Sequence, residues 1–183
     1  MHDFMYVLSE NVSAKANLKH IFKNLTIINF NYDRCIEQFL HRALQELFLV
    51  DRQTSAELVN GADIFHPYGK LADLPWQSRE NIEYGGDPFG NPIDLGVISR
   101  NIRTFNEEVD ATDQFEETRN RLIEAEKIIF LGFHFHRQNM EILRSNSPKR
   151  TRSSSYVLAS TYGRSEPDTR QIESRIRSLF GES

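Results

Sequence analysis

LTIINFNYDRCIEQFLHRALQEL, residues 25–47, contains the signals that decide the fold. Its first six residues form a mainly apolar run that is rich in β-branched side chains, the pattern of a strand buried on both faces. After the polar turn at 31–33, apolar side chains recur every three or four residues, as on one side of an amphipathic helix. These side chains are Ile36, Phe39, Leu40, Ala43, Leu44 and Leu47. The stretch therefore predicts a strand, a tight turn and a helix.

Two side chains of the turn, Asn31 and Asp33, stand at the carboxyl end of the predicted strand. In open α/β sheets, ligands bind in the crevice at the carboxyl ends of the strands. Both side chains are therefore candidates for ligand contact. Residue preferences alone favour a structural interpretation, in which Asp33 caps the following helix and Asn31 serves the turn.

Length and composition exclude several classes of protein. The 183 residues fit one domain over residues 1–183, and a net charge of −4 offers no basic face for nucleic acid. The single Cys35 excludes an internal disulfide framework and a Cys-rich zinc site. No apolar run is long enough to cross a membrane, and the first residues lack the features of a signal peptide. A cytoplasmic protein is expected.

Further strands and helices alternate along the chain. Strand patterns occur at 63–69, 127–132 and 156–160, and helical patterns at 14–23, 55–59, 93–105, 112–126 and 167–180. This alternation predicts a mainly parallel sheet covered on both faces. Residues 70–96 form a long irregular loop, which in a compact domain is more often functional or partly disordered than idle. The polar, Ser-rich residues 146–155 are predicted to be an exposed loop.

Three of the predicted strand ends carry polar clusters. They are Asn31-Tyr-Asp33, His66-Pro-Tyr-Gly69 and Gly132-Phe-His-Phe-His136. If the strands are parallel, their ends share one edge and these clusters converge. A metal site of His66, His134 and His136 is one alternative, although no carboxylate stands at a telling spacing beside them.

The ordered set FNYD (30–33), HPYGKL (66–71) and KIIFLGFHF (127–135), followed by Asn139, resembles the SIR2-like domains. The resemblance covers roughly residues 25–160 and implies a Rossmann-like three-layer α/β sandwich that binds or consumes NAD. It implies that Asn31 and Asp33 lie beside the nicotinamide and its ribose. The resemblance also predicts contacts to the cofactor from Tyr68, Gly132, His134 and Ser160.

The chain departs from that family in three ways. No Gly-rich phosphate loop precedes Leu25, so we expect either a truncated form of a longer protein or loss of the loop. Tyr68 occupies the place of the family's catalytic histidine, and His66 stands two positions earlier. Because a histidine has an unperturbed pKa of about 6.5 and a tyrosine about 10, His66 is the better base. The zinc-ribbon cysteines are absent, so neither zinc nor lysine deacetylation is expected.

The resemblance implies NAD or ADP-ribose as the ligand and cleavage of the nicotinamide–ribose bond as the reaction. Asn31 and His66 are then the catalytic residues, and an NAD-hydrolysing effector of prokaryotic antiphage defence is the expected setting. Neither nucleic acid nor a membrane is an expected partner. The alternative is an interaction module without catalysis, which forms a homo-oligomer or needs a partner chain or a missing segment for nucleotide binding.

Overall fold

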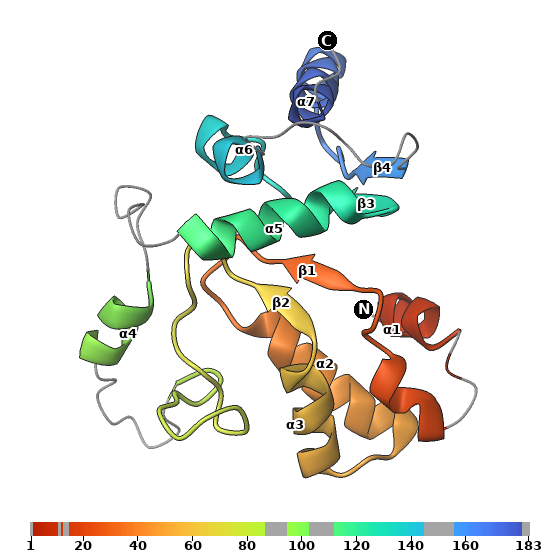
Figure 1. Ribbon diagram of the computed structural model, residues 1–183, viewed down its shortest axis with the longest axis vertical. Helices are drawn as coiled ribbons and strands as arrows, with labels where there is room; N and C mark the ends of the chain where they lie inside the picture. Colours follow the sequence, from red (N-terminus) through yellow and green to blue (C-terminus); the bar gives the residue numbers. More distant parts are fainter. Residues whose placement is uncertain are drawn as a thin grey trace. The chain divides into compact units, whose positions relative to one another are not determined.

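The computed structural model describes residues 2–10, 12, 15–86, 95–102, 112–144 and 156–180. The chain divides into two compact units, residues 1–104 and 105–183 (Figure 1). The described residues form seven α-helices, one 3-10 helix and four strands, and the strands pair in parallel within each unit. The predicted α/β class with parallel strands is confirmed. The single domain and the Rossmann-like three-layer sandwich stay predictions.

The first unit is built on one strand–helix–strand connection. Its elements are α1 (His2–Ser9), the 3-10 helix η1 (Lys15–His20), β1 (Thr26–Ile28), α2 (Cys35–Phe48), α3 (Arg52–Asn60), β2 (Asp63–Phe65) and α4 (Leu95–Asn101). β1 pairs with β2 from Thr26 opposite Asp63 to Ile28 opposite Phe65. Because parallel neighbours need a crossover, α2 and α3 return the chain to the start of β2. The carboxyl ends of both strands therefore point the same way.

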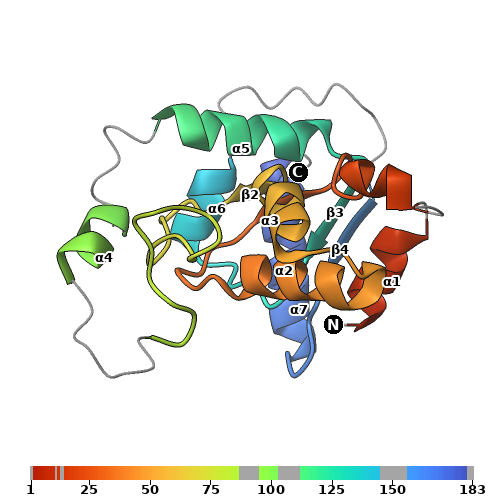
Figure 2. The same ribbon diagram turned by 90° about the horizontal axis from the view of Figure 1, so that it is seen from below.

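The core of the first unit lies between its helices, and α2 packs against α3 (Figures 1 and 2). The buried cluster consists of Met5, Leu18, Ile21, Phe22, Leu40, Ala43, Leu44 and Val59. The predicted helix 36–47 is confirmed, but its buried face is rotated from the predicted one. Leu47 is 44% exposed, whereas the polar residues Glu37 and His41 are buried. Two polar side chains, Glu37 and His41, therefore occupy part of the inner face of α2.

The second unit repeats the strand–helix–strand arrangement. Its elements are α5 (Thr112–Glu124), β3 (Lys127–Phe130), α6 (Arg137–Leu143), β4 (Tyr156–Ala159) and α7 (Glu166–Leu179). β3 pairs in parallel with β4, from Lys127 opposite Tyr156 to Phe130 opposite Ala159, and α6 lies in the connection (Figure 2). Helix α6 contacts both α5 and α7. The loop predicted at 146–155 lies outside the described residues.

Strand β3 was predicted to be buried on both faces, but one of its faces is exposed. Ile128 and Phe130 are buried, but Ile129 is 58% exposed. On the paired strand, Leu158 lies opposite Ile129 and is 62% exposed. A continuous apolar run is compatible with one or two covered faces, because sequence alone does not show how many layers pack on a sheet.

Candidate functional site

The turn after β1 is fixed by a buried asparagine. The Asn29 side chain accepts a hydrogen bond from the Asn31 backbone N–H at 3.0 Å and donates to the Asp33 carbonyl at 3.5 Å. The Asp33 carboxylate accepts a hydrogen bond from the Cys35 backbone N–H at 3.0 Å, which satisfies one orphan donor at the start of α2. The predicted cap is wrong, because Arg34 rather than Asp33 occupies the N-cap position of α2 and makes no side-chain capping bond. The Asp33 carboxylate still serves the turn through Cys35, and the Asn31 side chain is left exposed.

His66 joins the ends of β1 and β2. Its Nδ1 lies 3.1 Å from the Asn31 backbone oxygen, and its Nε2 lies 2.8 Å from Glu37 Oε1 on α2. Both side chains are buried, since His66 is 6% exposed and Glu37 is 2% exposed. The structure therefore brings together two residues predicted from separate motifs, His66 and Asn31, and adds a carboxylate that was not predicted.

The two hydrogen bonds of His66 fix the number of protons that His66 and Glu37 carry together, and so their net charge. A backbone carbonyl only accepts, so His66 Nδ1 carries a proton and donates it to Asn31. The bond between Nε2 and Glu37 needs a second proton, either on the imidazole or on the carboxyl group. The pair is thus an imidazolium with a carboxylate, or a neutral imidazole with a carboxylic acid. Both forms are neutral as a pair, which suits a site closed to water.

Aromatic rings surround the same edge. Tyr68 meets Phe30 edge to face, with ring centroids 5.9 Å apart, and its ring centroid lies 6.4 Å from that of Tyr32. Burial raises the pKa of Tyr68, and the neighbouring Tyr32 raises it further, so the phenol stays neutral near neutral pH. Tyr32 is 38% exposed. The edge therefore offers an aromatic surface beside the exposed Asn31 amide.

Arg34 fastens the following long loop to this turn. It is 5% exposed, and its guanidinium donates to the backbone carbonyls of Asp73, Ile82 and Glu83 at 3.0, 2.6 and 3.2 Å. Burial lowers the pKa of Arg34 and the nearby Glu37 carboxylate opposes that shift, but a guanidinium remains charged in proteins. Residues 70–86 of the loop predicted at 70–96 are therefore held by Arg34, and residues 87–94 of it lie outside the described residues.

The remaining predicted site residues belong to the second unit. Gly132 has a positive φ of 57°, and its N–H donates to the Ser160 hydroxyl at 3.0 Å, so these two residues meet at the ends of β3 and β4. His134 is exposed and its ring stacks on His136, with centroids 5.2 Å apart. In the described ranges, no group of three or more His, Cys, Asp or Glu side chains is arranged to hold a metal ion.

Sequence reasoning missed Asn29, Arg34, Glu37 and His41, all of which are buried. One signal was present. Glu37, Leu40, His41 and Leu44 recur at helical spacing, so two ionisable side chains interrupt a stripe of buried positions. Because buried polar groups need hydrogen-bond partners, such an interruption indicates a network inside the domain.

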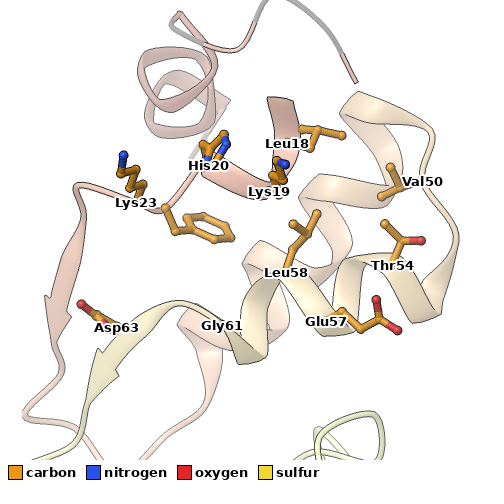
Figure 3. Close-up of a pocket in the computed structure, with 11 residues that line it drawn as sticks. Leu18, Lys19, His20, Lys23, Val50, Thr54, Glu57, Leu58, Gly61 and Asp63 are labelled. Carbon is orange, nitrogen blue, oxygen red and sulfur yellow. The ribbon is translucent and has the colours of Figure 1, made fainter. Parts of the chain in front are cut away.

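A cavity of about 710 Å³ in the first unit lies elsewhere, at the amino end of β2 (Figure 3). Figure 3 shows Lys19 and Lys23 on one side and Leu58 and Glu57 of α3 on the other. Its volume suits a small ligand. However, its polar side chains are exposed or half-buried, and none of the predicted site residues lines it. The buried polar chemistry lies at the carboxyl edge instead.

Comparisons of the chain with protein-family models, with curated proteins and with solved structures find no match. None of the helices in the described part of the chain is long and apolar enough to cross a membrane.

Proposed function

We propose that the carboxyl edge of the β1–β2 pair binds NAD or ADP-ribose, within a domain of SIR2-like, Rossmann-like architecture. The observation that carries the proposal is the contact between the two motifs, in which the His66 ring lies 3.1 Å from the Asn31 carbonyl. Two sequence motifs separated by more than thirty residues thus form one edge. Adjacent parallel strand ends are the usual ligand-binding place in α/β sheets.

The groups at this edge match the chemistry of a nicotinamide riboside. The exposed Asn31 amide can donate to and accept from a carboxamide or a ribose hydroxyl. The Asp33 carboxylate uses Oδ1 for Cys35, and Oδ2 can accept from a second ribose hydroxyl. The partly exposed rings of Tyr32 and Tyr68 offer faces on which a heteroaromatic ring can stack.

The reaction that we propose is hydrolysis of the nicotinamide–ribose bond. Water attacks the anomeric carbon, the carbon–nitrogen bond breaks, its electron pair neutralises the pyridinium nitrogen, and one proton is released. Asn31 and Asp33 would hold the ribose in the geometry for this attack. Both ring nitrogens of His66 are engaged, one with the Asn31 carbonyl and one with Glu37. His66 is therefore placed to position Asn31. Its predicted role as a base stays a prediction.

Other parts of the proposal rest on the resemblance alone. The contacts of Gly132, His134 and Ser160 to the cofactor stay predictions, and antiphage defence is the proposed setting. The Gly132–Ser160 hydrogen bond is compatible with this role, since it fixes the turn that follows β3.

Asn31→Ala tests the proposed binding without disturbing the turn. The structural hydrogen bonds of Asn31 use its backbone N–H and carbonyl, which alanine keeps. Isothermal titration with NAD and with ADP-ribose should show binding to the unmodified protein, and affinity at least about tenfold weaker in the variant. The matched control is Asn60→Ala, an exposed asparagine at the end of α3, which should bind normally. A folded protein that releases no heat with either ligand contradicts the proposal.

An interaction module is the second candidate, and one observation favours it. The outer face of the β3–β4 pair exposes four large apolar side chains, Ile129, Leu131, Tyr156 and Leu158, which are 58–74% exposed. Apolar patches of this kind mark surfaces that associate with other proteins. Self-association that Leu158→Glu abolishes, together with no binding of either nucleotide, would support this function over the first.

A further inference from the structure

Residues 70–86, here called the strap, run across the start of α2. The Leu71 N–H donates to the Tyr32 carbonyl at 3.0 Å, and Arg34 holds three strap carbonyls. Further along, the Tyr84 hydroxyl lies 3.1 Å from Cys35 Sγ. The residues that fasten the strap are therefore neighbours in sequence of Asn31 and Asp33, the residues of the proposed site.

Trp76 attaches the middle of the strap to α2. Its indole N–H donates to Gln38 Oε1 at 3.2 Å. Its ring stacks on that of His41, with centroids 4.2 Å apart and an angle of 15° between the planes. His41 is only 2% exposed, and the indole lies against one face of its ring. This stack is an aromatic contact in which one partner can acquire charge.

The hydrogen bonds of His41 define its protonation state. The Ser55 hydroxyl donates to the Arg52 carbonyl at 3.0 Å, so its oxygen accepts from His41 Nδ1 at 2.9 Å. In the neutral imidazole the proton is therefore on Nδ1. Nε2 is buried and has no hydrogen-bond partner among the described residues. A second proton on His41 would thus place a charge and a donor where no acceptor meets it.

We propose that the strap is closed by neutral His41 and is released from α2 when His41 is protonated. Opening would move the indole away and let the imidazolium reach water. Because Tyr32 and Arg34 belong to the turn of the proposed ligand site, release would also weaken nucleotide binding at acid pH. This last consequence rests on the proposed function, whereas the release itself does not.

The cations around His41 disfavour its protonated form. Burial lowers the pKa of His41, the Arg52 cation on α3 and the Arg42 cation on α2 lower it further, and hydrogen bonding to the Ser55 backbone opposes them. Glu37 lies one turn earlier on α2, and its Oε1 is engaged with His66. The strap contributes the uncharged indole of Trp76.

The sign of the pH dependence follows from this lowered pKa. When the strap opens, His41 regains an ordinary pKa of about 6.5. The closed form, with its lower pKa, binds fewer protons than the open form below that pH. Closure is therefore fully favoured above about pH 6.5 and is lost as the pH falls toward the lowered pKa of the closed form.

The experiment uses Trp76, which is the single tryptophan in the chain. Emission maximum and acrylamide quenching are recorded from about pH 8 to about pH 5, beside far-ultraviolet circular dichroism. We expect a red shift and stronger quenching with a midpoint below about pH 6.5, at unchanged helix content. His41→Gln should abolish the transition, and the control His20→Gln, at an exposed histidine, should keep it.

Arg52→Gln decides the question if His41→Gln fails to fold. Arg52 is exposed, and its carbonyl, which Ser55 uses, is kept. Removing this cation should raise the midpoint by about 0.3 pH unit. An unmoved or lower midpoint overturns the proposal, as does a transition that is absent, that persists in His41→Gln or that coincides with loss of helix. No nucleotide is present, so failure here is distinct from failure of the proposed function.

Discussion

Replacing His66 with alanine should lower the free energy of unfolding by about 3–5 kcal/mol, because the buried Glu37 carboxylate then loses its partner. The same change also removes the donor to the Asn31 carbonyl, so the two strand ends lose their shared side-chain hydrogen bond. Urea unfolding followed by circular dichroism measures the loss. This is the largest single-residue effect that we expect in the first unit.

The double variant His66→Leu with Glu37→Leu is the control for this prediction. Two apolar side chains of similar volume leave no buried charge, so most of the lost stability should return. A loss below about 1 kcal/mol in His66→Ala would mean that the pair is open to water and weakly coupled. His66 and Glu37 would then not form a closed pair that shares a proton.

Arg34→Ala should cost about 3 kcal/mol, because three strap carbonyls lose a charged donor together. Arg34→Lys should recover little, since one ammonium group cannot span three carbonyls in the way that a planar guanidinium does. Urea unfolding gives the energy. Limited digestion with trypsin reports the strap directly, because Lys70 and Arg79 lie within it.

Arg42→Ala is the matched control for Arg34→Ala, at an exposed arginine on the same helix. It should change the unfolding free energy by less than about 0.5 kcal/mol and leave the rate of tryptic cleavage in the strap unchanged. Equal cleavage rates in Arg34→Ala and the unmodified protein would show that other contacts hold the strap.

Strand β1 and helix α2 could be predicted because their signals are local, whereas α1 was not predicted and the helix predicted at 14–23 is the 3-10 helix η1. The run at 25–30 and the helical spacing that follows it each reflect the geometry of one element, and β1 and α2 appear at those places. Helix α3 is longer than the predicted 55–59, because Asp51 caps its start by accepting from the Thr54 N–H at 2.7 Å, a cap that was not predicted. The convergence of Asn31 and His66 followed from parallel pairing alone.

The interior of the site could not be predicted, because its contacts join residues far apart in sequence. Arg34 finds its acceptors 39 to 49 residues away, within a segment whose prolines and glycines give no periodic signal. His41 is covered by Trp76 from that same segment. The rotation of the buried face of α2 toward Glu37 and His41 likewise depends on partners that only the folded chain supplies.

Mapping ADP-ribose by amide chemical shifts tests the central claim most directly. The labelled protein is titrated with ADP-ribose, and the shifted backbone amides are assigned. We predict that they cluster at 29–35 and 66–71, the two segments that His66 joins. Asn31→Ala should remove these shifts and leave the rest of the spectrum in place. A cluster at the cavity residues of η1 and α3, or no shifts at all, would contradict a ligand site at the carboxyl edge of β1 and β2.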